Sequence, residues 1–185
     1  MHYVRTAAGL AVAAIVAGLG ILYSGVVDVG ATQPHHALTR WLLHTGMKES
    51  VRHHAEGIAV PPLYDPQMVM EGFRHYREMC VGCHLAPGIK NSEIRQGLMP
   101  RPPRLQLAAE RWKPAQLFWI VKHGVRMTAM PAWGNTHSDA KIWAIVAFLE
   151  KLPGMTASRY QEMDKEAGLG DGDDHHAAGH SGDHG

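Results

Sequence analysis

The only two cysteines of this 185-residue chain lie three positions apart, in the stretch Cys80-Val81-Gly82-Cys83-His84. Two thiols at this spacing, followed directly by an imidazole, are typical of a covalent haem attachment site. In that chemistry each thiol forms a thioether with a haem vinyl group, and the adjacent histidine becomes an axial ligand of the iron. The stretch therefore predicts one covalently attached haem c, held by Cys80 and Cys83 and coordinated by His84.

Two other kinds of site use closely spaced cysteines. A thioredoxin-like dithiol needs a strand before the motif and a helix after it, whereas here a helical pattern precedes the motif and prolines follow it. A structural zinc site needs two further Cys or His ligands at compatible spacing, and the sequence has no second pair of cysteines. Haem attachment is the interpretation that fits the surrounding sequence.

The composition restricts the class of partner. Lysine and arginine total 18 and aspartate and glutamate total 17, so no strong net charge favours nucleic acid, and we expect no nucleic-acid partner. With both cysteines assigned to one motif there is no disulfide framework to indicate the compartment. The length allows one small domain with appendages.

An apolar segment without charged residues extends over residues 6–27. As a helix these 22 positions would span about 33 Å, close to the thickness of a bilayer's hydrocarbon core. The lone cation before it, Arg5, favours a cytoplasmic N-terminus. We therefore expect residues 1–31 to form a single-pass anchor in a bacterial inner membrane, with the haem domain in the periplasm. A signal peptide cleaved at the small residues 29–31 is the open alternative.

Residues 32–63 predict a connector that is partly helical. Leu38, Trp41 and Leu42 have the spacing of an amphipathic helix, which should end near Gly57. Such a helix could pack on the haem domain, or it could be a docking or membrane-surface segment. The histidines in this region do not by themselves predict a metal site, because no carboxylate or cysteine accompanies them at ligand spacing. They are His35, His36, His44, His53 and His54.

Residues 64–153 predict a small all-α domain. Asp65 and Pro66 are typical of the N-cap and the first position of a helix. Similar signals predict helices at about residues 65–79, 114–123 and 139–152. The prolines between residues 87 and 103 exclude a central strand or a long helix, and they predict a loop wrapped around a bulky group.

Residues 154–185 are predicted to be a disordered tail. From Gly170 onward the chain consists almost wholly of Gly, Asp, His, Ala and Ser, which cannot bury enough apolar surface to become ordered. Weak metal binding by the histidines of this tail remains an alternative. These are His175, His176, His180 and His184.

A helix ending at the cysteine motif, a proline-rich loop, a Met-Pro loop and an aromatic C-terminal helix together resemble class I cytochromes c. The resemblance covers roughly residues 65–152. With its anchor, the chain resembles the membrane-tethered bacterial monohaem members. The matching positions are Gly72 and Tyr76 in the first helix, Pro103-Arg104-Leu105 after the motif, Met130-Pro131, and Phe148-Leu149 in the last helix.

The resemblance implies a ligand set. Met130 would be the distal ligand of the iron, and the carbonyl of Pro103 would accept a hydrogen bond from the imidazole of His84. Leu105 would lie in the haem pocket. Competing possibilities remain open for the distal position: Met127 could exchange roles with Met130, one of the two filling the core, and His123 or His137 could give bis-histidine ligation.

Four tryptophans are expected to line the haem pocket and the core, because a largely apolar porphyrin needs such walls. They are Trp112, Trp119, Trp133 and Trp143. Arg104 and Arg126 could pair with the haem propionates or could be ordinary surface residues.

The resemblance implies a one-electron carrier and not an enzyme. A thioether ligand favours the reduced state relative to a second imidazole. Partners would be a quinol-oxidising complex, a dehydrogenase or a terminal oxidase. Two alternatives remain: a haem subunit of a larger membrane dehydrogenase or oxidase complex, and a sensor or enzyme with an open sixth position on the iron.

Overall fold

The structure is a computed structural model that describes residues 2–169, and the chain divides into two units, residues 1–33 and 34–185. The first unit contains helix α1 (His2–Tyr23), which is long and apolar enough to cross a membrane by length and composition. It begins and ends four residues earlier than the apolar segment in the sequence predicts.

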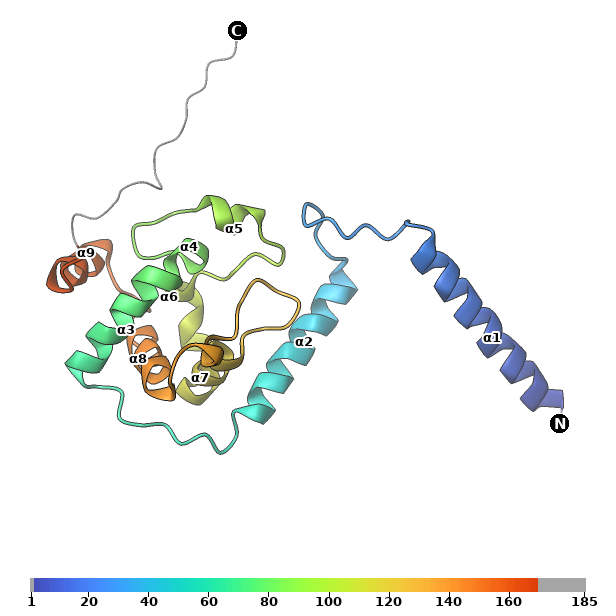
Figure 1. Cartoon of the computed structure of the whole chain (residues 1–185), viewed down its shortest axis with the longest axis horizontal. Helices are drawn as coiled ribbons and strands as arrows, with labels where there is room; N and C mark the ends of the chain where they lie inside the picture. The colour runs from blue at the N-terminus through green and yellow to red at the C-terminus, as the bar shows by residue number, and fades with distance from the viewer. Residues whose placement is uncertain (1, 170–185) are drawn as a thin grey trace, which may run out of the picture. The chain divides into compact units, whose positions relative to one another are not determined.

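The second unit is built from short helices (Figure 1). No strand occurs in residues 2–169, which confirms the predicted all-α class. In chain order the elements are α2 (Ala37–His54), α3 (Pro66–Met79), α4 (Val81–His84), α5 (Glu93–Gly97), α6 (Leu105–Ala108), η1 (Ala109–Arg111), α7 (Pro114–His123), η2 (Trp133–Asn135), α8 (Asp139–Leu149) and α9 (Ala157–Glu166).

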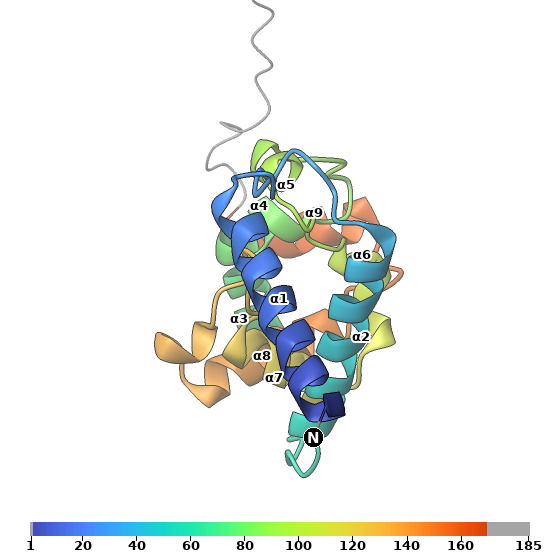
Figure 2. The same ribbon diagram turned by 90° about the vertical axis from the view of Figure 1, so that its right-hand side faces the viewer.

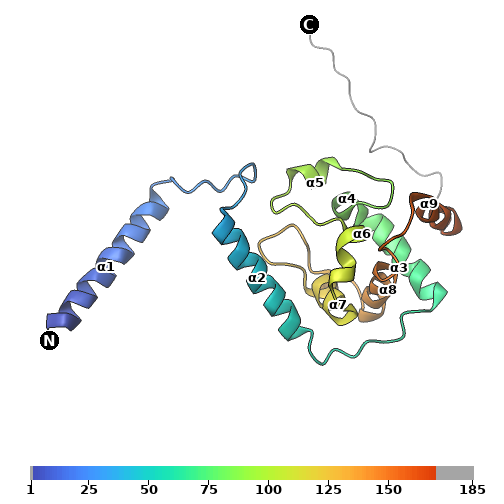
Figure 3. The ribbon, with the colours of Figure 1, turned by 180° about the vertical axis from the view of Figure 1, so that it is seen from behind.

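The core of this unit forms where α3 packs against α8 (Figures 1 and 3). Gly72 allows the close approach, because a Cβ at that position would lie 1.8 Å from the carbonyl oxygen of Ala144. Beside the crossing, the rings of Phe73 and Phe148 pack edge to face with centroids 5.4 Å apart. Residues 142–149 of α8 are all buried, so this helix is enclosed by the rest of the unit.

The helix starts follow the capping signals in the sequence. The Asp65 side chain accepts a hydrogen bond from the backbone N–H of Gln67 at 2.9 Å, which confirms the predicted N-cap of α3. Pro114 is the first residue of α7, and Gly124 ends that helix with φ 65°. Within this unit, α4 and α5 lie at one end and α7 and α8 lie at the other (Figure 2).

The predicted disorder of residues 154–185 is wrong for their first part, because residues 157–166 form α9. Thr156 caps this helix by accepting from the backbone N–H of Arg159 at 3.2 Å. Tyr160 and Met163, three positions apart, are both buried in the core, and this burial orders an otherwise charged segment. Residues 170–185, with the four tail histidines, lie outside the described residues.

The connector contains the predicted helix, and the face that packs is not the one whose spacing predicted it. In α2 the residue that is buried is Val51, and the ring of His54 lies 5.5 Å from that of Trp119 on α7. Leu38, Trp41 and Leu42, whose spacing predicted the helix, are exposed. The C-terminal half of α2 therefore attaches to α7, while its N-terminal half presents apolar side chains to solvent.

Candidate functional site

The two cysteines and the adjacent histidine lie on one helical turn. Cys80 is the C-cap of α3 and directly precedes α4, and its carbonyl accepts from the backbone N–H groups of Cys83 at 3.1 Å and of His84 at 2.8 Å. Positions three and four apart on a helix share a face. The turn therefore brings the two thiols and the imidazole to the same side of the backbone.

Both thiols are free, and burial makes that of Cys80 a weak acid. Desolvation raises the pKa of Cys80 to about 12, with a smaller contribution from the nearby Cys83. A reactive dithiol needs a lowered thiol pKa, so this environment does not support the thioredoxin-like alternative. Within residues 2–169 no three His, Cys, Asp or Glu side chains meet in a way that could hold a metal ion, so a structural zinc site is not supported either.

His84 is oriented by a backbone carbonyl, since its Nδ1 lies 2.9 Å from the carbonyl oxygen of Pro103. A carbonyl can only accept, so Nδ1 carries the proton and the lone pair of Nε2 is free. Burial lowers the pKa of His84, the hydrogen bond to Pro103 opposes this, and the charge of Arg95 adds to the lowering. A neutral imidazole with a fixed tautomer is the form that binds a metal ion.

The turn after His84 is held from inside the core. Leu85 adopts a left-handed backbone conformation, φ 63°, which is unusual for a residue with a Cβ. Its carbonyl oxygen accepts a hydrogen bond from the buried hydroxyl of Tyr76 at 2.5 Å. Sequence reasoning matched Tyr76 only as an aromatic residue at the helix crossing, and it contained no signal for this bond.

The loop that carries Pro103 is braced by a short helix that the prolines concealed. Ser92 caps α5 by accepting from the backbone N–H of Arg95 at 3.2 Å, and its own hydroxyl donates to the carbonyl of Gly82 in α4. Arg95 in turn donates from Nε to the carbonyl of Pro102 at 3.2 Å. These contacts connect α5 to the cysteine motif through Ser92 and to the residue before Pro103 through Arg95.

After α7, residues 125–130 form a closed loop. The backbone N–H of Val125 donates to the carbonyl of Met130 at 3.2 Å. The hydroxyl of Thr128 donates to the carbonyl of Val125 at 2.7 Å and accepts from the backbone N–H of Met130 at 3.1 Å. Thr128 therefore connects the start of the loop to the residue at its end.

The two methionines of this loop differ in environment. Met130 is partly buried and packs against the hydrophobic core. Met127 is 90 % exposed with φ 59°, so of the two it is not the one that fills the core. His123 is exposed beside Trp119 at the end of α7, and His137 is partly buried with its ring 5.3 Å from that of Trp133.

Most of the remaining predicted site residues contact the core. Leu105, Trp112 and Trp133 are partly buried against it, and Trp143 is buried and stacks on Phe118 with centroids 4.2 Å apart. Trp119 differs from the expectation, because it packs against α2 through His54.

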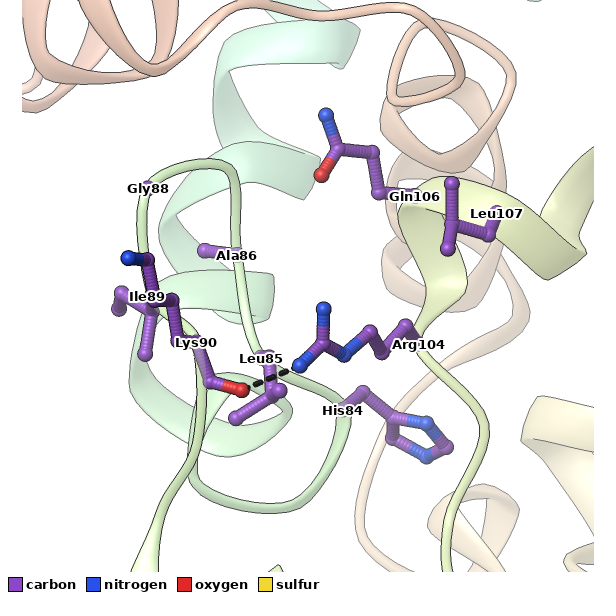
Figure 4. A pocket seen from close by; sticks show the side chains of 9 residues that line it. All are labelled: His84, Leu85, Ala86, Gly88, Ile89, Lys90, Arg104, Gln106 and Leu107. Atoms are coloured by element: carbon purple, nitrogen blue, oxygen red, sulfur yellow. Dashed lines mark hydrogen bonds between the residues drawn. The ribbon is translucent and has the colours of Figure 1, made fainter.

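An open pocket of about 280 Å³ lies beside His84 (Figure 4). Arg104 extends across it and donates to the carbonyl of Lys90, and Gln106 lines it from α6. Arg126, the other candidate for a propionate contact, is exposed. The bond to Lys90 holds the Arg104 guanidinium in a pocket that His84 also lines.

The residues present fit a covalently bound haem. They supply two free thiols on the face that also bears an imidazole with an available Nε2. They also supply the partly buried thioether of Met130 on a braced loop, and Trp112 and Trp133 pack against the same core. This donor set is the one that a haem with two thioether bonds and two axial ligands requires.

One comparison with known proteins identifies this region. Residues 67–149 match a family model described as cytochrome C oxidase, cbb3-type, subunit III. The match begins within α3 and ends at the last residue of α8, so it includes the cysteine motif and the loop of Met130 but neither α2 nor α9. No curated protein matches the chain.

Proposed function

Since residues 67–149 form a c-type cytochrome domain, a haem-based electron-transfer module, we propose that this protein is a membrane-tethered one-electron carrier with His84 and Met130 as the axial ligands. The haem domain would comprise residues 64–153, and the carrier would act without a substrate-binding site. When bound, haem c supplies an iron that alternates between Fe(II) and Fe(III).

The observation that carries the proposal is the contact between His84 and Pro103. A hydrogen bond from Nδ1 fixes the tautomer and the ring orientation, and it leaves the lone pair of Nε2 available to bind iron. Cys80 and Cys83 would hold the porphyrin on the same side of the chain. Leu105 and Trp133 would cover it with apolar surface.

Met130 supports the carrier role because it would fill the sixth position. Its loop is closed by the hydrogen bond between the backbones of Val125 and Met130 and by the bonds of Thr128. These bonds restrain the backbone that carries the Met130 side chain. With both axial positions occupied by protein, small molecules have no open site on the iron. The thioether also favours the reduced state, which suits transfer towards an oxidase.

We further propose that α1 anchors the protein in a bacterial inner membrane with the haem domain in the periplasm. The length and composition of α1 support the anchor. The position of Arg5 before its apolar core supports the orientation. A tether raises the effective concentration of the domain near membrane partners. These partners would be a quinol-oxidising complex, a dehydrogenase or a terminal oxidase.

Carbon monoxide binding and a redox titration of the purified full-length protein test the carrier role together. We expect one covalently bound haem, a one-electron titration, and a reduced spectrum that carbon monoxide changes only slowly, because Met130 must first leave the iron. A rapid spectral change with carbon monoxide would show an open sixth position and would favour the sensor or enzyme alternative.

A second candidate function is a haem subunit of a larger membrane oxidase complex. The description of the matching family as an oxidase subunit favours it. Extraction in mild detergent followed by size analysis separates the two functions: a carrier is expected to elute alone, and a subunit is expected to co-elute with integral membrane proteins at fixed stoichiometry.

A further inference from the structure

The N-terminal half of α2 has an apolar face that packs on nothing in the described residues. Leu38, Trp41 and Leu42 form this apolar stripe, with Leu38 and Leu42 one turn apart on the same side. Leu42 precedes the buried Val51 by nine positions, so at about 100° per residue it points roughly opposite to the face that contacts α7. The stripe is therefore directed away from the haem domain, and the domain cannot cover it.

The charges around the stripe favour an anionic surface. No acidic residue occurs between residues 29 and 48, while Arg40 and Lys48 are both exposed on α2. The one acid of the helix, Glu49, lies seven positions after Leu42 and so on the same side, but it pairs with Arg52. A helix with leucines and a tryptophan on one face, and with only cations in its N-terminal part, is typical of segments that lie in the headgroup region of a bilayer.

The chain also keeps this helix near a membrane. The linker between the end of α1 and the start of α2 has 13 residues, Ser24 to His36, so it can reach at most about 45 Å. Because the linker holds the stripe close to lipid, the effective concentration of the bilayer surface around it exceeds that of most soluble partners. The apolar side chains would therefore be buried at the bilayer interface.

We infer that the apolar stripe of α2 binds the surface of the bilayer, with the helix lying in the interface and Lys48, seven positions after Trp41, near anionic phospholipid headgroups. This inference rests on the proposed membrane anchorage by α1 and adds a second contact with the membrane. Because the other half of α2 packs on α7, and α7 leads through Gly124 into the loop of Met130, the contact also orients the haem domain relative to its membrane partners.

Site-specific photocrosslinking in native membranes tests the inference on the full chain. A p-benzoylphenylalanine replaces Leu42 in one variant and Leu43 in its matched control. Both leucines are 55 % exposed, but Leu43 lies off the stripe. A third variant with the same residue at Leu19, inside α1, reports the anchor. Mass spectrometry then identifies whether each adduct is a phospholipid or a protein.

We expect phospholipid adducts with the variants at Leu42 and Leu19, and only background levels of adduct with the variant at Leu43. Phospholipid at Leu19 but none at Leu42 would overturn the inference while leaving the anchor intact. Equal lipid adducts at Leu42 and Leu43 would also overturn it, and a protein adduct at Leu42 would show that a partner protein covers the stripe. Lipid adducts at neither Leu19 nor Leu42 would contradict both the anchorage and the inference.

Discussion

Gly72 of α3 and Ala144 of α8 lie so close that a Cβ on Gly72 would come within 1.8 Å of the Ala144 carbonyl oxygen. The nearest atoms are backbone and cannot rotate away, so the two helices would have to separate. We predict that Gly72→Ala lowers the free energy of unfolding by about 3 kcal/mol or more, since overpacking a core typically costs 1–3 kcal/mol even where side chains can adjust.

Denaturant unfolding of the full chain checks this prediction, with Gly46→Ala as the control. A Cβ at Gly46, in the middle of α2, meets no atom within 4 Å. That substitution should be neutral or stabilise the protein by up to about 1 kcal/mol, as expected for replacing a helical glycine. A Gly72→Ala protein as stable as the parent would contradict the tight crossing of α3 and α8.

The two buried tyrosines should respond differently to loss of their hydroxyls. Tyr76 donates to the carbonyl of Leu85, whereas the hydroxyl of Tyr160 has no hydrogen-bond partner among the described residues. We predict that Tyr76→Phe costs about 1–3 kcal/mol, because the buried carbonyl is left unsatisfied, and that Tyr160→Phe is neutral or stabilising. Equal losses in thermal or denaturant unfolding would refute this assignment of the bond.

Substitution of Met163 tests how much α9 contributes to the stability of the domain. It is 4 % exposed and packs in the core, so Met163→Ala should lower the free energy of unfolding by about 2–5 kcal/mol. Gln161→Ala, on the exposed side of the same helix, should stay within about 0.5 kcal/mol of the parent. If the two variants were equally stable, α9 would be dispensable for the haem domain.

Thr128 should determine how firmly Met130 is held. Thr128→Ala removes two hydrogen bonds of the loop, each worth about 1 kcal/mol, so the loop should open roughly ten-fold more often or more. The readout is the rate at which the reduced protein captures carbon monoxide, which requires Met130 to be displaced. Thr128→Ser keeps the hydroxyl and should restore the parent rate. An unchanged rate in Thr128→Ala would mean that the bonds do not restrain the loop.

The features of the fold and site that could be predicted from the sequence are those that depend on a few neighbouring residues. The N-cap at Asp65, the start of α7 at Pro114 and its end at Gly124 follow from single residues and their neighbours, and the structure has all three. In each case a short stretch of chain carries its own geometric requirement. The contact between His84 and Pro103 was instead implied by the resemblance to class I cytochromes c, and the structure has it.

The errors concern residues whose role depends on tertiary packing. α9 was missed because only Tyr160 and Met163 are buried in a charged segment, although their spacing of three was a weak signal. In α2 the visible apolar stripe was more conspicuous than the single buried residue, Val51. Nothing in the sequence distinguished the exposed Met127 from Met130, because their burial is set by the closed loop.

The most direct test of the central claim is the optical spectrum of the oxidised protein with Met130→Ala and Met127→Ala compared against the parent. If His84 and Met130 are the axial ligands, the methionine-to-iron charge-transfer band is present in the parent, persists in Met127→Ala and disappears in Met130→Ala. A band that survives Met130→Ala, or that disappears only in Met127→Ala, would contradict the assignment.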